Sequence, residues 1–404
     1  MDKDLLQDLS MEYGDSFYLL HSDVFRNNYS DMLNAFRKLY HSTEIAYSYK
    51  TNYTPTLCRI INESGENAEI VSEMEMWLAE KIGVSAGHIF YNGPYKKEKF
   101  VEKLMLGGGH INLDGAYEVS MVQRIAAHHP DRKFKVGIRC ALDIGQEVPT
   151  RFGFDVSSGD MRKALETLNG IANVSVSGMH CHIPFRSLDT FEKRMNSLKT
   201  VLEEFCEYSW EYISLGGGYM GPVSEQLASQ MDVKPPTYDD YARVIAGGMN
   251  TLFCDTVNKP VLIIEPGSAL AANAMQYVTK VINIKSSRNK DIATLSGSTY
   301  QMNPSVKNVN RPISIYHFSD EEKCYKNMDL AGYTCIKSDY LYKGYSGGLA
   351  VGDYVVFDNV GSYSVVMKPP FILPDIPMLE IHSDDSYEVI KRAQRSDEVF
   401  AYFN

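Results

Sequence analysis

Two kinds of hydrophobic pattern alternate along the first two thirds of the chain. Short runs rich in β-branched and aromatic residues are separated by longer stretches in which apolar positions recur every three or four residues. The short runs predict strands at residues 45–50, 68–72, 88–91, 111–114, 134–140, 174–182, 212–215 and 261–265. The longer stretches predict helices in most of the gaps, at 56–63, 73–82, 118–127, 161–171, 190–205 and 239–253. Eight strands alternating with helices predict an α/β fold, a (β/α)₈ TIM barrel, with a doubly wound sheet as the alternative.

The pattern changes after residue 275. Residues 278–284, 293–295, 313–317, 354–357 and 364–367 are predicted strands separated by polar, Gly-rich or Pro-rich turns rather than by helices. This predicts a C-terminal β domain, sandwich-like or barrel-like, to which residues 16–20 contribute one more strand. We therefore expect a barrel domain over 22–275 and a β domain made of 1–21 and 276–404. Residues 144–150 and 233–237 are expected to be exposed connections.

Composition narrows the class of protein. The 404 residues hold 40 Lys+Arg against 51 Asp+Glu, a net charge of −11, which argues against a nucleic-acid or anionic-membrane protein. The seven cysteines are irregularly spaced without a CxxC pair, so neither a disulfide scaffold nor a metal site is expected. No apolar run approaches the ~20 residues of a membrane span. With no signal-like N-terminal segment, the expectation is a cytoplasmic protein.

The ends of the predicted barrel strands carry reactive or polar side chains, where barrel enzymes place their active sites. These residues are Lys50, Arg139, His180, His182, Gly216, Gly217, Gly218 and Glu265. Each alone also fits an ordinary role, such as a solvated lysine or a glycine turn. Together they meet the needs of pyridoxal phosphate: an amine for a Schiff base, backbone N–H groups for the phosphate, an imidazole for the ring face and a carboxylate for the pyridine nitrogen.

Ten segments between about residues 45 and 363 carry a family resemblance. They are AYSYKTN, EIVSEMEM, FYNGPYK, INLDGAYE, RFGFD, GMHCHI, SLGGGY, IEPGS, CIKSD and DNVGSYS, in that order. The sequence resembles the fold-type III pyridoxal phosphate decarboxylases, the diaminopimelate, ornithine and arginine decarboxylase superfamily. GMHCHI and CIKSD lean towards the diaminopimelate decarboxylase branch. The family fold is likewise a barrel with a β domain.

The resemblance implies roles for the cofactor-binding residues. Lys50 becomes the Schiff-base lysine, His182 stacks on the cofactor ring, and Glu265 faces the pyridine nitrogen. The phosphate is held by the three glycines, Gly216, Gly217 and Gly218. Tyr363 contacts the phosphate or the substrate.

The resemblance also implies a proton donor and an oligomer. Cys335 resembles the cysteine that helps to protonate the carbanion after carbon dioxide leaves. In this family that cysteine and its neighbours reach the partner's site, which implies an obligate homodimer with shared active sites. Asp339 and Arg139 are either structural supports or ligand contacts.

Two departures from the family pattern fall on the phosphate site. After His182 the family continues Gly-Ser, whereas this chain has Pro184-Phe185-Arg186-Ser187. The family's Glu-Pro-Gly-Arg is here Glu-Pro-Gly-Ser, ending at Ser268. We hypothesise that Arg186 supplies the missing charge and Ser187 the missing hydroxyl. The alternative is that Arg186 is a surface residue and the glycines suffice.

A third departure concerns the substrate. The family has an acidic residue after the cysteine, which reads a distal ammonium, and this chain has Ile336. A buried ammonium without an anion costs several kcal/mol. Lys337 either favours an acidic tail or is solvated, and Arg311 resembles the family's substrate-carboxylate arginine. These changes predict decarboxylation of a modified or carboxylated amino acid of siderophore or other secondary metabolism, rather than housekeeping lysine synthesis.

Two other functions fit parts of the pattern. A pyridoxal phosphate racemase or epimerase has a similar architecture and a Schiff-base lysine, but Glu265 favours a full electron sink and hence decarboxylation. A non-catalytic homologue would account for the departures. Retention of the reactive residues, Cys335 included, argues against it.

Overall fold

The computed structural model describes residues 2–305, 309–318, 323–368 and 370–403. Contacts divide the chain into two compact units. One, the barrel unit, comprises Tyr29–Met220 and Pro236–Ala269. The other, the sheet unit, comprises the residues up to Asn28, Gly221–Pro235 and the chain from Leu270 onward. Each unit is described by itself.

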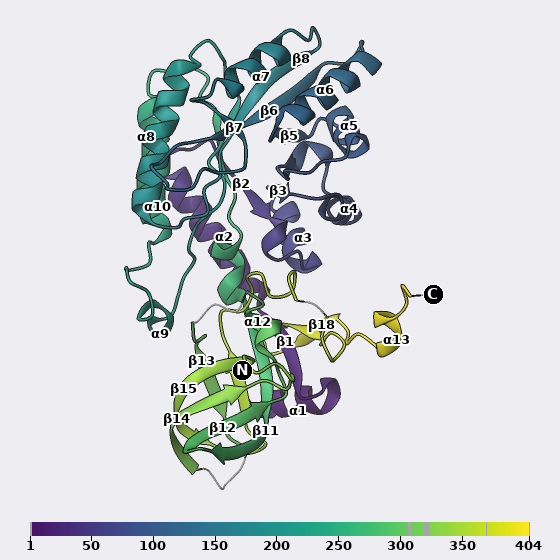
Figure 1. Ribbon diagram of the computed structural model, residues 1–404, viewed down its shortest axis with the longest axis vertical. Coiled ribbons are helices and arrows are strands. Elements are labelled where there is room, and N and C mark those ends of the chain that lie inside the picture. Colours follow the sequence, from purple (N-terminus) through teal and green to yellow (C-terminus); the bar gives the residue numbers. More distant parts are fainter. Residues whose placement is uncertain (1, 306–308, 319–322, 369, 404) are drawn as a thin grey trace. The chain divides into compact units, whose positions relative to one another are not determined.

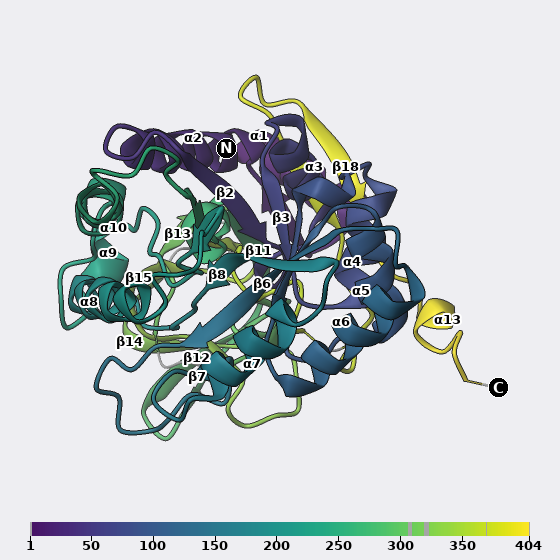
Figure 2. The ribbon, with the colours of Figure 1, turned by 90° about the horizontal axis from the view of Figure 1, so that it is seen from above.

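Eight parallel strands form the centre of the barrel unit (Figure 2). They follow the order β5-β4-β3-β2-β10-β9-β8-β6, and a pairing between β5 and β6 closes the ring. The strands are β2 (Thr43–Ser48), β3 (Asn67–Ile70), β4 (Ile89–Tyr91), β5 (His110–Leu113), β6 (Phe134–Ala141), β8 (Val174–His180), β9 (Tyr212–Ser214) and β10 (Val261–Ile264), with the short β7 (Phe154–Asp155) attached to β6. The closed ring confirms the predicted barrel and excludes the doubly wound sheet.

Helices surround these strands (Figures 1 and 2). They are α2 (Ser22–Arg37), α3 (Pro55–Glu63), α4 (Glu73–Lys81), α5 (Glu98–Leu106), α6 (Ala116–His128), α7 (Asp160–Asn169), α8 (Leu188–Glu204) and α10 (Tyr238–Leu252). Their apolar stripes are buried, as Leu57, Ile60 and Ile61 of α3 illustrate, which explains why helical periodicity located most of them. None of the helices in the described ranges is both long and apolar enough to cross a membrane.

A tyrosine occupies the barrel interior beneath the strand ends. Tyr212 of β9 is buried and donates its hydroxyl to Asn112 Oδ1 of β5 at 2.7 Å. A Cβ atom at Gly178 of β8 or at Gly137 of β6 would overlap the Tyr212 side chain. The two glycines therefore make room for a ring that fills the barrel and supports the polar groups above it.

The sheet unit is built mainly from nine strands. They are β1 (Ser16–Leu20), β11 (Met275–Ser287), β12 (Lys290–Leu295), β13 (Ile313–Tyr316), β14 (Lys323–Ala331), β15 (Tyr340–Leu349), β16 (Tyr354–Phe357), β17 (Met378–Ile381) and β18 (Tyr387–Lys391). The short helices are α1 (Lys3–Tyr13), α9 (Glu225–Ala228), α12 (Thr299–Met302) and α13 (Ser396–Val399), while α11 (Ser268–Ala271) follows β10. As predicted, residues 16–20 join this sheet, antiparallel to β11 and parallel to β17.

One predicted strand of this unit is wrong. Residues 364–367 form a turn, in which the Lys368 N–H bonds back to the Ser364 carbonyl at 3.2 Å. A helical-type hydrogen bond at this spacing is incompatible with an extended strand, although the apolar residues there suggested one. The pattern also missed α1, β14, β15, β17 and β18.

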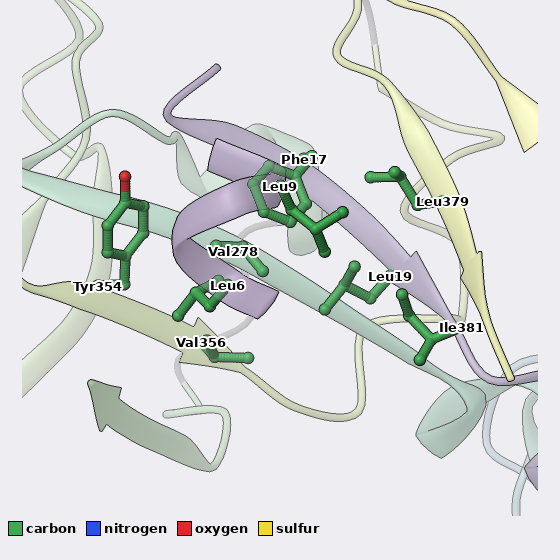
Figure 3. Packing of buried hydrophobic residues seen from close by; sticks show 9 residues of the cluster. All are labelled: Leu6, Leu9, Phe17, Leu19, Val278, Tyr354, Val356, Leu379 and Ile381. Carbon is green, nitrogen blue, oxygen red and sulfur yellow. The ribbon is translucent and has the colours of Figure 1, made fainter. Parts of the chain in front are cut away.

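A compact apolar cluster forms a core of the sheet unit (Figure 3). Leu6 and Leu9 of α1 pack against strand side chains, among them Phe17, Leu19 and Val278. Its other members are Tyr354, Val356, Leu379 and Ile381. Burial of side chains from both ends of the sequence explains how the N-terminal segment becomes part of a C-terminal domain.

Candidate active site

Lys50 lies at the carboxyl end of the first barrel strand. The predicted strand ran to residue 50, but β2 ends at Ser48 and Lys50 follows in a 3-10 turn over Tyr49–Thr51. The Lys50 ammonium forms an ion pair with Glu69 at the end of β3 and lies 3.5 Å from Ser48 Oγ. The Lys50 side chain is 31% exposed and that of Glu69 only 1%. The amine therefore opens to the mouth of the barrel, with a buried carboxylate beside it.

Glu265 follows β10 and is buried within a polar network. Its Oε1 accepts hydrogen bonds from Ser214 Oγ at 2.6 Å and Asn92 Nδ2 at 2.9 Å, and His180 Nε2 lies 3.2 Å away. Burial alone would raise the pKa of Glu265, but His180, Lys50 and the Ser214 hydrogen bond hold that pKa well below its usual range. Glu265 is therefore a carboxylate at any physiological pH.

A chain of hydrogen bonds joins the two carboxylates. Asn92 Nδ2 contacts Glu69 Oε1 at 3.3 Å as well as Glu265, and Asn92 Oδ1 accepts from Asn112 at 2.7 Å. Glu69 and Asn92 lie within EIVSEMEM and FYNGPYK, two of the segments that carry the family resemblance, but no role was predicted for either residue. Their position at strand ends was the available signal.

His182 contacts the glycine loop that follows β9. The Gly217 N–H donates to His182 Nδ1 at 2.9 Å. Burial, followed by the nearby charge of Lys50, lowers the pKa of His182 well below its ordinary value. His182 is therefore a neutral imidazole, and because Nδ1 accepts a hydrogen bond, its proton resides on Nε2.

The glycine loop approaches neighbouring backbone closely. A Cβ atom at Gly216, Gly217 or Gly218 would lie 2.5 to 2.9 Å from a backbone carbonyl oxygen, and the φ angles of Gly216 and Gly218 are +64° and +100°. Within the described part of the chain, the N–H groups of Gly218 and Tyr219 donate to no acceptor. Adjacent unused N–H groups in such a turn form a site for an anion.

Arg186 and Ser187 take different positions beyond His182. Arg186 is exposed, and its Nη2 donates to Ser268 Oγ at 3.3 Å. It therefore reaches the position at which the sequence departs from the expected arginine. Ser187 caps α8 instead: its hydroxyl accepts from the Thr190 N–H at 3.3 Å and pairs with Thr190 Oγ1 at 2.9 Å.

A cavity of about 660 Å³ opens beside His182. It lies between residues 144–152 and the segment that leads into α8. Apolar lining comes from residues such as Phe152 and Phe185, and the charged lining residues are Glu147, Arg151 and Lys193. The Arg151 guanidinium lies 4.2 Å from the centre of the Phe152 ring, whereas Lys193 is paired with Asp189.

A comparison with protein families assigns this barrel. The family model of the pyridoxal-dependent decarboxylases, pyridoxal binding domain, matches residues 26–272. The chain belongs to the pyridoxal-dependent decarboxylase family. It is accordingly a carboxy-lyase that uses pyridoxal phosphate.

Similar proteins cover nearly the whole chain. Diaminopimelate decarboxylase of Methanocaldococcus jannaschii is 25% identical over 98% of this chain and 92% of that protein. The L-glutamyl-[BtrI acyl-carrier protein] decarboxylase of Niallia circulans is 24% identical over 99% of this chain and 96% of that protein. The crystal structure of the M. jannaschii enzyme covers 98% of this chain and 94% of its own, with a TM-score of 0.88 at 23% identity. The likeness between the structures establishes the shared fold.

The barrel residues suit the cofactor of this decarboxylase family. An anion fits the unused N–H groups of the glycine loop, and a protonated ring nitrogen suits the Glu265 carboxylate. Lys50 supplies an amine at the mouth. Arg139 lies on β6 and pairs with Asp114 at 2.9 Å, both largely buried. The donor set therefore matches both ends of pyridoxal phosphate.

The remaining predicted residues belong to the sheet unit. Cys335 is exposed, Ile336 and Arg311 are half-buried, and Tyr363 has a φ of +58°. Asp339 is buried and fully engaged. Its Oδ1 accepts from Ser298 and from the Thr299 N–H, and its Oδ2 accepts twice from Thr334. Asp339 thus fixes the turn that carries Cys335.

Proposed function

We propose that this pyridoxal phosphate decarboxylase acts on a modified or carboxylated amino acid of specialised, siderophore-type or secondary metabolism. The proposal rests on the isoleucine at position 336. The family resemblance implies an acidic residue at this position, which would bind the distal ammonium of the substrate, and the Ile336 side chain provides no negative charge for it.

Residues 22–275 are the proposed cofactor-binding barrel domain, and residues 1–21 and 276–404 the proposed β domain; contacts place 22–28, 221–235 and 270–275 with the sheet unit instead. When bound, pyridoxal phosphate supplies an electron sink for the electrons left at the substrate's Cα when the carboxylate departs as carbon dioxide. Lys50 would hold the cofactor through its amine. His182 would stand against the ring face, with Gly216, Gly217, Gly218, Arg186, Ser187 and Tyr363 towards the phosphate.

Three side chains would handle charge and protons. Glu265 would hold a proton on the ring nitrogen, because its carboxylate is kept ionised by His180, Lys50 and Ser214. His182, being neutral, would add no charge beside the cofactor ring. Cys335 would donate a proton to Cα in place of the lost carboxylate and regain it from water, so that one carbon dioxide leaves and one proton is consumed per turnover.

The turn around Asp339 supports an unusual substrate tail. Asp339 is the one acidic residue of CIKSD, and four hydrogen bonds from Ser298, Thr299 and Thr334 already occupy its two oxygens. It therefore does not replace the acid missing at Ile336. The exposed Lys337 beside it favours a tail without positive charge.

The cavity beside His182 also suits a carboxylated or extended tail. Its volume of about 660 Å³ exceeds the needs of a free α-amino acid. Among the described residues that line it, Arg151 is a cation without a carboxylate partner. One similar protein is named as a decarboxylase of an L-glutamyl group on an acyl-carrier protein, whereas several others are named diaminopimelate decarboxylases.

The test is carbon dioxide release from a panel of substrates. The purified protein with pyridoxal phosphate would receive meso-diaminopimelate, lysine, ornithine, glutamate and carrier-bound L-glutamate. We expect the highest kcat/KM with an acidic or carrier-bound substrate, and an Ile336→Glu variant should shift preference towards lysine and ornithine. A kcat/KM for diaminopimelate in the ordinary enzyme range, above about 10⁴ M⁻¹ s⁻¹, would overturn the specialised substrate. Racemisation without carbon dioxide would overturn the reaction itself.

We also propose a homodimer with shared active sites, in which Cys335 serves the partner's Lys50. Lys50→Ala and Cys335→Ala chains would be mixed under conditions that exchange subunits. Random pairing leaves about a quarter of the sites intact, so activity should recover to about a quarter of the wild-type value. No recovery, together with proven subunit exchange, would contradict shared sites.

A further inference from the structure

Arg194 of α8 is fully buried and bonds only to backbone carbonyls. Its side chain has no exposed surface. Nη1 donates to the carbonyls of Leu215 and Gly217, the latter at 3.3 Å, and Nη2 donates to the Ile183 carbonyl at 2.8 Å. The guanidinium thus fastens the loop after β9 to the segment after β8, directly behind the glycine loop.

The charge of Arg194 is not balanced by an ion pair. No carboxylate forms a salt bridge with it among the residues that the structure describes, and its guanidinium lies 4.1 Å from the centre of the Phe191 ring. Burial lowers the pKa of Arg194, but a guanidinium remains protonated in proteins. A buried cation without a counter-ion costs several kcal/mol, so this position favours a nearby anion.

The peptide unit between Gly217 and Gly218 connects the charge of Arg194 to the opposite face of the glycine loop. In a trans peptide the C=O and the N–H point in opposite directions. The Gly217 carbonyl faces Arg194, so the N–H of Gly218, in the same peptide unit, faces away from it. Within the described chain, that N–H and the one of Tyr219 are the two in residues 216–219 that donate to no acceptor. A Cβ atom at Gly218 would lie 3.8 Å from Arg194 Nη2, which shows how closely the loop covers the guanidinium.

We propose that Arg194 is a positioning residue for the cofactor phosphate, and that its buried charge replaces the cation missing at Ser268. It acts through the glycine loop: it fixes the Leu215 and Gly217 carbonyls on one side and polarises the Gly218 N–H on the other. This inference rests on the proposed role of Gly216, Gly217 and Gly218 in holding the phosphate. The two arginines would thus act differently on the phosphate: Arg194 from its buried position behind the glycine loop, and Arg186 from the exposed rim of the site.

The experiment compares two cofactors that differ only in the phosphate. Dissociation constants of pyridoxal phosphate and pyridoxal would be measured by absorption on apo-protein, for the wild type, Arg194→Met and Arg194→Lys. Arg194→Met should weaken pyridoxal phosphate about 10–100-fold, the scale of a lost charge-assisted hydrogen bond, and pyridoxal less than about 3-fold. Arg194→Lys, which keeps the charge, should retain most of the preference for the phosphate.

Two further variants test the replacement directly. Arg194→Met/Ser268→Arg should recover at least about 10-fold in pyridoxal phosphate affinity, because it restores a cation on the same group. Lys199→Met is the matched control, an exposed lysine of the same helix, and should change neither constant. If Arg194→Met does not fold, Arg194→Gln, which keeps N–H donors for the carbonyls but carries no charge, gives the ratio of the two constants instead, alone and combined with Ser268→Arg.

Three outcomes overturn the proposal or its basis. Equal weakening of pyridoxal and pyridoxal phosphate in Arg194→Met would make Arg194 a packing residue. Failure of Ser268→Arg to restore affinity in a folded double variant would reject the replacement. Wild-type protein that binds pyridoxal as tightly as pyridoxal phosphate would instead refute the phosphate role of the glycine loop itself.

Discussion

The two sides of the barrel mouth hold their charges in opposite ways. Around Glu265, carboxylates meet an imidazole, an ammonium and amide donors directly, and the charges are close to balanced. Around the glycine loop, a buried arginine meets only carbonyls and two N–H groups remain unused in the described chain. The Glu265 side can therefore hold or release one proton without a large change in net charge. The glycine-loop side has an excess of positive potential and suits a group that is always negatively charged, such as a phosphate.

The difference teaches what each end of a cofactor demands. A ring nitrogen needs one proton held at a fixed point, for which a direct carboxylate contact is sufficient. A phosphate needs about two negative charges neutralised, which requires several donors and at least one cation. The changes at Pro184 and Ser268 fall on the second side, where backbone donors and other arginines can share the task.

Removal of the amine should have the largest effect. Lys50→Ala should lower kcat by at least about 10³-fold, the scale of losing a member of a catalytic unit, and abolish the visible absorption band of lysine-bound pyridoxal phosphate. Steady-state carbon dioxide release and an absorption spectrum would measure both. Lys97→Ala, at an exposed lysine paired with Glu73, is the control and should retain full activity.

Removing the charge of Glu265 should have the second-largest effect. Glu265→Gln preserves the shape of the side chain but removes the charge that holds the ring proton, so we expect kcat to fall about 10²–10³-fold. The dissociation constant of pyridoxal phosphate should change far less. A variant that keeps kcat within 10-fold while losing cofactor would reverse the roles of the two sides.

The balanced side also predicts a pH effect on stability. Burial raises the pKa of Glu75, a buried residue of α4 whose side chain accepts a hydrogen bond from the Val71 N–H, from 4.5 to about 7. Between those pH values the folded protein binds more protons than the unfolded chain, so this carboxyl makes the free energy of unfolding fall as pH rises. Glu75→Gln should flatten that decline by about 1–3 kcal/mol, measured by denaturant unfolding at pH 5 and pH 8. An unchanged slope would contradict the buried, protonated carboxyl.

The smallest effect is expected at the exposed rim. Because Arg186 is exposed, Arg186→Ala should weaken pyridoxal phosphate only about 2–5-fold, in line with solvent-screened charges. Arg243→Ala, an exposed arginine of α10, is the control and should have no effect. A loss as large as that expected for Arg194→Met would show that the rim, rather than the buried arginine, carries the charge.

The hydrophobic periodicity predicted the barrel well because its helices bury regularly spaced apolar residues and its strands bury short apolar runs. It failed in the sheet unit, where several elements have no regular apolar pattern. Residues 364–367 include two β-branched valines and a methionine, as a short strand could, yet a local hydrogen bond from the Lys368 N–H turns them. The polar strands β14, β15 and β18 lack an apolar pattern. Tertiary contacts, absent from any local window, decide such segments.

The site was partly predictable for a similar reason. Lys50, His182 and Glu265 stand at strand ends, where position indicates chemistry. Arg194 lies within LDTFEKRMNSLK, a helix rich in charge, where an arginine ordinarily faces water. Only the packing of α8 against the loops after β8 and β9 distinguishes it from its exposed neighbour Lys193.

The turn fixed by Asp339 has an evolutionary consequence. Its anchors are Ser298, Thr299 and Thr334, and none of them is among the four residues between Thr334 and Asp339. The side chains of residues 335–338 can therefore be substituted while the hydrogen bonds of Asp339 still hold the turn. A few substitutions in these four positions can change which substrate is recognised, and the conformation of the turn is retained.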